Sequence, residues 1–147
     1  MPGTFFCGSG VIFNFFFLVL FSCFSVSSAD SYSYGSAVVV KVRKVIDGDT
    51  FRCDLQGLPD IIGKNISVRI ADIDAPELRG TRGDIKKNAE MARKELKRII
   101  LSGDSIILKR MKRGKFFRIV ADVCIDGKDV GNHLVNMGLA VSRIYEN

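Results

Sequence analysis

The distribution of charge divides this chain into two parts. Residues 1–29 contain no Lys, Arg, Asp or Glu, whereas all 22 basic and all 16 acidic side chains follow them. The charged part, about 118 residues, is long enough for one compact domain and too short for two. This length excludes multidomain enzymes. The net charge of +6 predicts an anionic partner, which could be nucleic acid, an acidic membrane surface or an acidic protein.

The charge-free part has the features of an export signal. Its apolar run over residues 11–26 is short for a bilayer-spanning helix, which needs about 20 residues. Small residues follow at 27–29, so we predict a signal peptide over residues 1–29. The mature protein would then be secreted or held in the cell envelope or periplasm. Two alternatives anchor it to a membrane: an uncleaved leader, because residues 1–10 lack basic side chains, or lipidation of Cys23.

The charged part predicts a single α+β domain that is mainly β. Residues 30–37 are a polar linker and residues 38–147 are the domain. Val-rich or alternating runs bounded by Gly, Pro and Asp predict five strands. These strands are expected at residues 37–46, 50–55, 66–73, 105–111 and 117–125, with a loop at residues 56–65.

Two helices complete the expected fold. A stripe at helical spacing predicts the longer one between the third and fourth strands; it consists of Ile85, Ala89, Ala92, Leu96 and Ile99. Asp84 is its expected N-cap, and it should end near Leu101. A short helix is expected at residues 130–137. This order suits a five-stranded Greek-key barrel of the OB type, with a split sheet covered by helices on one face as the alternative.

Two carboxylates stand where a strand meets a turn. Asp49 ends the turn Asp47-Gly48-Asp49, and Asp74 closes the third strand. Side chains so placed can converge, and a carboxylate pair suits a hard cation; Ca²⁺ also accepts backbone carbonyls and water. Asp-Gly-Asp is equally a common turn sequence, so a purely structural role is the alternative.

Arg69 lies in the middle of an otherwise apolar strand. A buried guanidinium is costly unless a carboxylate or a ligand phosphate neutralises it. Asp74, Glu77 and Arg118 are the further candidates for this site, and a structural Arg69–Asp74 ion pair is the alternative. Asp72 is expected on the opposite face of the strand from Arg69.

Cysteine and histidine give no metal-binding pattern. Cys53 and Cys124 lie in strand-like runs, where buried thiols are commoner than a disulfide, although one bond between them is the alternative. The sequence has no C-x-x-C pair and only one histidine, so zinc is not expected. That histidine, His133, lies in an amphipathic stretch and should pack or face solvent.

Several short motifs in order resemble the staphylococcal nuclease-like (thermonuclease) family. They are VIDGDT at residues 45–50, Arg69 leading into IDAPE at residues 73–77, Arg118 ahead of DGK at residues 126–128, LV at residues 134–135 and GLA at residues 138–140. The resemblance covers about residues 38–145. It implies an OB-fold nuclease that uses Ca²⁺ to hydrolyse the phosphodiester bonds of DNA and RNA, leaving 3′-phosphate ends.

The resemblance also implies roles for individual residues. The metal ligands would be Asp49, Asp74 and the backbone carbonyl of Ala75. The catalytic set would be Arg69, Glu77 and Arg118. In physical terms, the two arginines neutralise charge that develops on the phosphate, and Glu77 orients or deprotonates the attacking water.

The basic run before Arg118 is expected to bind substrate through Lys112, Arg113, Lys115 and Phe116. The family's namesake has a Tyr where Phe116 stands, so this chain keeps a stacking surface there and loses the hydroxyl. The partners would be DNA and RNA, with single strands preferred and no small-molecule cofactor.

Two other classes of function compete with the nuclease. A catalytically inactive nucleic-acid-binding module could share the fold, but it would not need Arg69, Glu77 and Arg118 together. A basic protein-interaction domain would leave the placement of Arg69 unexplained. Cleavage of single-stranded DNA and RNA with Ca²⁺ or with a chelator would separate these classes.

The export hypothesis gives a first testable prediction. Protein recovered from its native host should begin at Asp30 or a near neighbour, because the small residues at 27–29 end the apolar run. N-terminal sequencing measures this directly. A chain that still begins at Met1, or one that is acylated at Cys23, would contradict the prediction.

Overall fold

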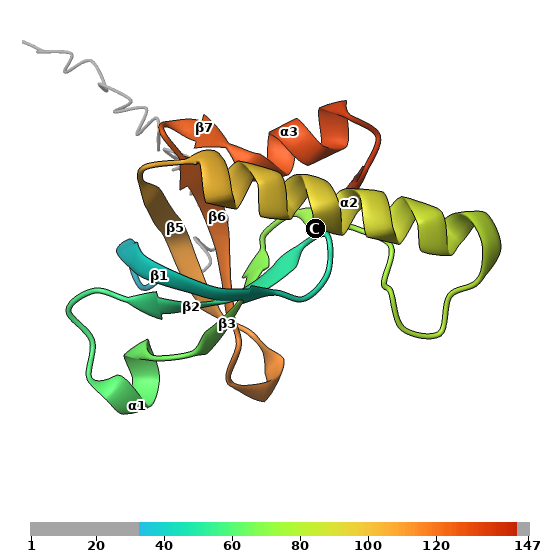
Figure 1. Cartoon of the computed structure of the whole chain (residues 1–147). Coiled ribbons are helices and arrows are strands. Elements are labelled where there is room, and N and C mark those ends of the chain that lie inside the picture. Colours follow the sequence, from blue (N-terminus) through green and yellow to red (C-terminus); the bar gives the residue numbers. More distant parts are fainter. Residues whose placement is uncertain (1–32, 144–147) are drawn as a thin grey trace, which may run out of the picture. The chain divides into compact units, whose positions relative to one another are not determined.

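The computed structural model describes residues 33–143 (Figure 1). The predicted signal peptide, its cleavage site and Cys23 lie outside these residues. Within the described range, no helix is both long enough and apolar enough to cross a membrane.

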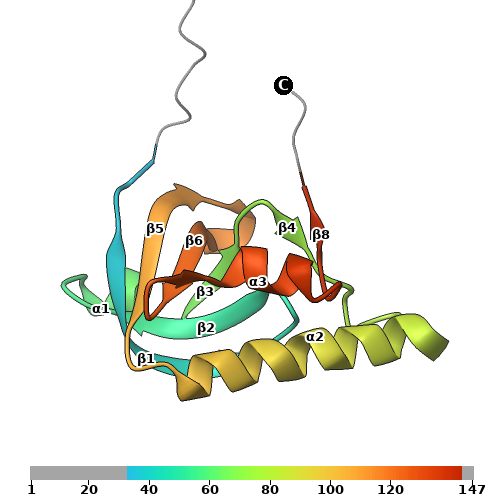
Figure 2. The ribbon, with the colours of Figure 1, turned by 90° about the horizontal axis from the view of Figure 1, so that it is seen from above.

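Five strands form a closed barrel. They are β1 (Ala37–Val45), β2 (Thr50–Leu55), β3 (Ile66–Ile70), β5 (Ile106–Arg113) and β6 (Ile119–Ile125). β1 pairs antiparallel with β2 and with β5, β2 pairs with β3, and β5 pairs with β6. A parallel pairing of β3 with β6 closes the ring (Figure 2). The predicted OB-type Greek-key barrel is therefore confirmed, and the split sheet is excluded.

Side-chain alternation explains why these segments form a barrel. Ile66, Val68 and Ile70 of β3 are buried, whereas Ser67 and Arg69 between them are partly exposed. Because successive strand residues point to opposite faces, one face of β3 fills the core and the other carries Arg69. The barrel core also contains fully buried side chains from β2, β5 and β6, among them Phe51, Leu108 and Val123.

The long helix α2 (Gly83–Ser102) packs along the barrel against β1 and against the short helix α3 (Val130–Asn136). Its prediction was wrong in two details. Arg82 occupies the N-cap position, and Asp84 lies inside the first turn. Ile85 is 59% exposed, so the buried stripe begins only at Ala89. Figure 2 gives the reason: the N-terminal turns of α2 extend past the barrel.

Five short elements lie outside the predicted pattern. The expected loop contains the one-turn helix α1 (Asp60–Gly63), and the chain adds β7 (Lys128–Asp129) and the 3-10 turn η1 (Lys115–Phe117). The expected third strand ends early, at Ile70. Asp72 adopts a left-handed conformation (φ 56°), after which β4 (Ile73–Asp74) pairs with β8 (Val141–Ser142). The chain thus turns out of the barrel just before Asp74.

The cysteines lie in the protein interior, and the histidine lies at the surface between two helices. In the described part of the chain, Cys53 and Cys124 are buried free thiols. Burial raises the pKa of the Cys53 thiol to about 12. His133 of α3 lies 2.9 Å from the Glu95 carboxylate of α2, so it links the two helices at the surface. These positions agree with the predicted buried thiols and with the non-catalytic interpretation of His133.

A close approach of small residues fixes the turn between β1 and β2. A Cβ atom added to Gly48 would lie 2.5 Å from the Cβ of Ala92 in α2 and 2.9 Å from the Cβ of Ala75. Both distances are far inside van der Waals contact, so only glycine fits here. The turn that carries Asp49 is therefore pressed between α2 and the segment after β4.

This packing gives a testable prediction. Gly48→Ala should lower the free energy of unfolding by about 1–3 kcal/mol, because the added methyl group overlaps Ala92 and Ala75. The measurement is urea denaturation at neutral pH. Ala92→Gly removes the nearest atom, so the double variant should be less destabilised than the sum of the two single variants. Strict additivity would show that Gly48 and Ala92 are not in steric contact.

Candidate active site

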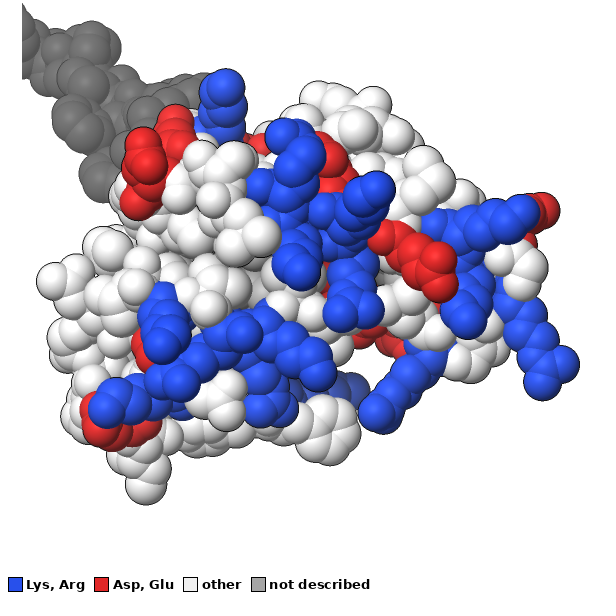
Figure 3. Space-filling model, viewed as in Figure 1, with Lys and Arg blue, Asp and Glu red and all other residues white. Residues whose placement is uncertain are grey.

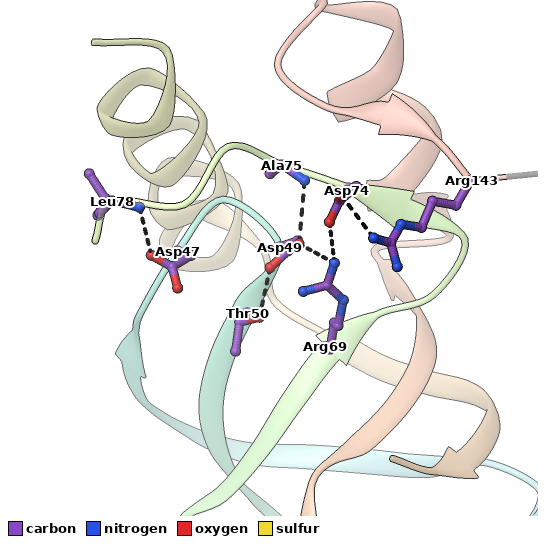
Figure 4. Close-up of polar contacts among 8 residues, drawn as sticks. All are labelled: Asp47, Asp49, Thr50, Arg69, Asp74, Ala75, Leu78 and Arg143. Carbon is purple, nitrogen blue, oxygen red and sulfur yellow. Dashed lines mark hydrogen bonds and ion pairs between the residues drawn. The ribbon is translucent and has the colours of Figure 1, made fainter. Parts of the chain in front are cut away.

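Both aspartates of the β1–β2 turn hold the segment that follows β4. The Asp49 carboxylate is almost fully buried and accepts hydrogen bonds from the Thr50 hydroxyl (2.7 Å) and from the Ala75 amide (3.3 Å). Asp47 accepts a long hydrogen bond from the Leu78 amide at 3.5 Å (Figure 4). The structural role of Asp-Gly-Asp is therefore present, and it brings Asp49 beside Asp74 and Ala75.

Arg69 lies between the two candidate metal-binding carboxylates. Its Nη2 atom lies 3.0 Å from Asp49 Oδ2 and 2.5 Å from Asp74 Oδ1 (Figure 4). Arg143 approaches the other oxygen of Asp74 at 3.1 Å. The expected Arg69–Asp74 ion pair is therefore present, and Asp49 extends it to a second carboxylate. These contacts neutralise a guanidinium whose side chain is only 18% exposed.

A cleft of about 730 Å³ opens beside this cluster. Most of the predicted site residues line it: Arg69, Asp74, Ala75, Glu77, Lys112, Lys115 and Arg118. Asp49 does not line the cleft and lies behind Arg69. The strand register explains the convergence, because Arg69 on β3 pairs with Val120 and Val68 pairs with Ile119 on β6. Arg118 immediately precedes β6 and so reaches the wall that Arg69 occupies.

Arg118 and Glu77 contribute groups without protein partners to the cleft. The Arg118 Nε atom is buried and has no hydrogen-bond partner among residues 33–143. A buried donor without a partner is unfavourable, and the Arg118 side chain itself lines the cleft. Glu77 is exposed, and within the same range its carboxylate makes no hydrogen bond or ion pair. A cationic donor and an unengaged carboxylate thus face one space.

Two predicted substrate-binding residues lie elsewhere. Arg113 is not on the wall of the cleft; its guanidinium lies 4.6 Å from the ring centroid of Phe117. Phe116 is 97% exposed at the tip of the β5–β6 hairpin and also lies off the wall. Their prediction as cleft residues rested on their position next to Lys112 and Lys115 in the sequence. It was wrong because the hairpin turns between Lys112 and Arg118, so neighbouring side chains point to different sides.

Four other charged residues, which were not among the predicted site residues, also line the cleft: Asp72, Arg110, Asp122 and Arg143. Arg110 donates hydrogen bonds to Asp122 and to Asp72 (3.3 Å), and these carboxylates, Asp122 first, raise the pKa of its guanidinium. The expectation that Asp72 faces away from Arg69 was wrong, because the chain leaves the strand geometry at residue 71. Arg143, the fourth missed residue, follows a two-residue strand that has no recognisable local pattern.

The carboxylates of Asp49 and Asp74 are oxygen ligands of the kind that suits a hard cation. Among residues 33–143, no three His, Cys, Asp or Glu side chains gather as a metal-binding group. Asp49 and Asp74 nevertheless converge on a single point, the Nη2 atom of Arg69. A cation bound there would compete with Arg69 for the same oxygens, and backbone carbonyls and water would have to complete its coordination.

The fold is thus a closed OB barrel that carries Arg69, Arg118 and Glu77 in one cleft. The family model described as staphylococcal nuclease homologue matches residues 67–147. The chain therefore belongs to the staphylococcal nuclease family, as the motifs predicted.

Three relatives carry endonuclease names. The chain is 33% identical over 112 residues to Endonuclease YncB of Bacillus subtilis, covering 74% of this chain and 50% of the relative. It is 33% identical to the SPbeta prophage-derived endonuclease YokF of Bacillus subtilis, covering 74% of this chain and 36% of the relative. An uncharacterized endonuclease of Haemophilus influenzae is 30% identical over 80% of this chain and 57% of its own length. The chain thus spans about half the length of the first of these relatives.

Proposed function

We propose that this protein is a Ca²⁺-dependent endonuclease that hydrolyses phosphodiester bonds of DNA and RNA and leaves 3′-phosphate ends. The observation that carries the proposal is the convergence of Arg69, Arg118 and Glu77 on one cleft beside Asp49 and Asp74. Membership of the staphylococcal nuclease family and the endonuclease names of three relatives support it.

The two arginines would bind the scissile phosphate. Each guanidinium presents a planar fork of N–H donors that matches two phosphate oxygens. Arg118 has a buried Nε without an acceptor among the described residues, and Arg69 stands on the adjacent strand. Donors fixed in this way stabilise the charge that builds up on the phosphate oxygens as water attacks.

Glu77 would act on the attacking water. Its carboxylate is solvent-exposed on the cleft wall and is not engaged by another described side chain, so it can accept a proton or a hydrogen bond from water. As the water oxygen bonds to phosphorus, the bond from phosphorus to the 5′ oxygen breaks. The 5′ oxygen takes up a proton, and the phosphate stays on the 3′ side.

Asp49, Asp74 and the backbone carbonyl of Ala75 would hold the Ca²⁺ ion. When bound there, the ion would supply positive charge that polarises a phosphate oxygen. The buried position of Asp49 and its hydrogen bonds from Thr50 and Ala75 fix one carboxylate in advance. Asp74 is more exposed, and its present partners are the two arginines Arg69 and Arg143.

The substrate would be an extended single strand. Lys112 and Lys115 line the cleft next to Arg118 and would contact flanking phosphates.

The protein would act outside the cytoplasm. The predicted signal peptide over residues 1–29 supports secretion or a place in the cell envelope. An uncleaved leader or a lipid on Cys23 would instead keep the enzyme at a membrane.

The first test separates an enzyme from a binding module. Arg69→Lys keeps the charge and loses the planar fork, so the cleavage rate should fall by roughly 10² to 10³. Glu77→Gln should lower the rate at least as much with little loss of affinity for the strand. The measurement is cleavage of labelled single-stranded DNA and RNA, with binding measured in chelator.

Glu90→Gln is the matched control for this test. Glu90 lies exposed on α2 and outside the cleft, so its neutralisation should leave the rate unchanged. Wild-type protein that binds but never cuts would establish a binding module. Cleavage indifferent to both Arg69→Lys and Glu77→Gln would overturn the assigned roles.

The second test concerns the metal. Asp49→Asn keeps the size of the side chain but removes its charge, so it should weaken Ca²⁺ binding in calorimetry, and more Ca²⁺ should restore part of the activity. Asp47→Asn is the matched control, because Asp47 belongs to the same turn and its carboxylate hydrogen-bonds only the Leu78 amide among the described residues. Equal effects of both variants would show that the turn, and not a ligand, was disturbed.

The third test concerns salt. Binding to a single strand should weaken as salt rises, and each lost phosphate contact lowers the slope of log affinity against log salt by about 0.7. Neutralising Lys112 and Lys115 together should therefore reduce the slope by about 1.4. Basic side chains cover much of the face that carries α2 in Figure 3, so a charge-matched control is needed. Lys94 and Lys97 on α2 serve for this purpose, and an equal slope change in both double variants would contradict the cleft contacts.

A further inference from the structure

A second, apolar groove lies directly beside the candidate active site. Its volume is about 270 Å³, and Lys112 and Arg118 line both this groove and the cleft. Its apolar lining comes from distant parts of the chain: Tyr34, Leu58, Ile62, Ile66, Met111 and Phe117. The two spaces therefore adjoin at Lys112 and Arg118, although one is charged and the other is largely apolar.

An aromatic side chain stands at the edge of this groove in an unusual backbone conformation. Phe117 is 51% exposed, and both Phe116 and Phe117 have left-handed φ angles, 56° and 58°. Bulky L residues rarely adopt this conformation, and such outliers cluster at functional sites. Hydrogen bonds from the Gly114 amide to the Arg118 carbonyl (2.7 Å) and from the Arg118 amide to the Lys115 carbonyl (3.3 Å) close the tip. The backbone of Arg118 thus holds the turn that presents Phe117.

Arg113 completes a stacking surface. Its guanidinium carbon lies 4.6 Å from the ring centroid of Phe117, which is within cation–π distance. A flat cation against an aromatic ring offers both a π-surface and a positive charge. Nucleobases stack on both kinds of group, and this stacking tolerates any base because every base has a π-face.

The neighbouring cleft identifies the occupant of the groove. A nucleic-acid strand whose phosphate contacts Arg118 carries its bases within reach of the adjoining apolar surface. The faces of the bases are the large apolar surfaces of such a strand. Lys112 and Arg113 at the rim favour a negatively charged ligand over an uncharged apolar one. We propose that Phe117, stacked with Arg113, binds one unpaired base of the strand next to the phosphate at Arg118. This proposal rests on the proposed function, because it takes the cleft to bind a nucleic-acid strand.

The proposal narrows the substrate. A base inside a duplex is stacked on both faces and paired along one edge, so it cannot enter the groove without being extruded. Single-stranded DNA or RNA presents such a base directly. The groove would therefore favour single strands by a contact that does not depend on charge, in addition to the salt-sensitive contacts of the cleft.

The test uses the full protein in chelator and short single strands of about 8 to 12 nucleotides, within the range that one OB fold covers. One nucleotide at a time is replaced by an abasic residue, which removes the base and keeps the phosphate. Fluorescence anisotropy at low salt gives the affinity of each strand. One position should weaken binding about 10-fold, whereas the others should change it little.

A double-mutant cycle then assigns that base to Phe117. Phe117→Ala should weaken binding of the intact strand about 10-fold and cause no further loss with the strand abasic at the sensitive position. Phe117→Tyr keeps the ring and should bind both strands as the wild type does, so it serves if Phe117→Ala folds poorly. Ile61→Ala is the control, because Ile61 is 84% exposed and does not line the groove.

The outcomes separate this inference from the proposed function. Additive losses, or a strand in which no abasic position matters, would overturn the stacking site even if the protein cleaves nucleic acid. Coupling between Phe117 and one base in a protein that never cleaves would support the stacking site and reject the nuclease. A protein that binds no single strand would overturn both.

Discussion

The parallel pairing of β3 with β6 is the contact on which the rest of the molecule depends. It joins strands that are about fifty residues apart in the sequence and closes the barrel, so the sheet has no open edge at this point. The same pairing places Val68 beside Ile119 and Arg69 beside Val120. Arg118 therefore enters the wall that already carries Arg69, and the two arginines line one cleft because the barrel closes.

The turn between β1 and β2 contributes both to the packing of the fold and to the position of Asp49 in the candidate site. Gly48 allows the chain to press against Ala75 and Ala92, where a side chain would overlap both. This contact delivers Asp49 to the backbone amide of Ala75 and to the guanidinium of Arg69. One residue that lacks a side chain thus positions a buried carboxylate, and a change at Gly48 would disturb stability and the site together.

Charge and apolar surface are separated around Arg118. On one side lies the cleft with its carboxylates and lysines, and on the other lies the groove with Phe117 and Ile62. A nucleic-acid strand has the same division, with charge on its phosphates and π-faces on its bases. The Arg113–Phe117 stack keeps a cation at the edge of the apolar side, so both surfaces suit one ligand.

The sequence by itself determined the five strands, because strand alternation and turn residues act locally. The pairing of β3 with β6 decided between a closed barrel and a split sheet. Ordered motifs also predicted one site from Asp49, Arg69, Asp74, Glu77 and Arg118, and the structure places these residues near one another. Only the tertiary structure decided which neighbours share the cleft. Arg143 and Asp72 enter it through β4–β8 pairing and a left-handed turn, whereas Arg113 leaves it for Phe117. The exposure of Ile85 likewise depends on where the barrel ends beneath α2. These features arise from contacts between distant segments, which no local pattern encodes.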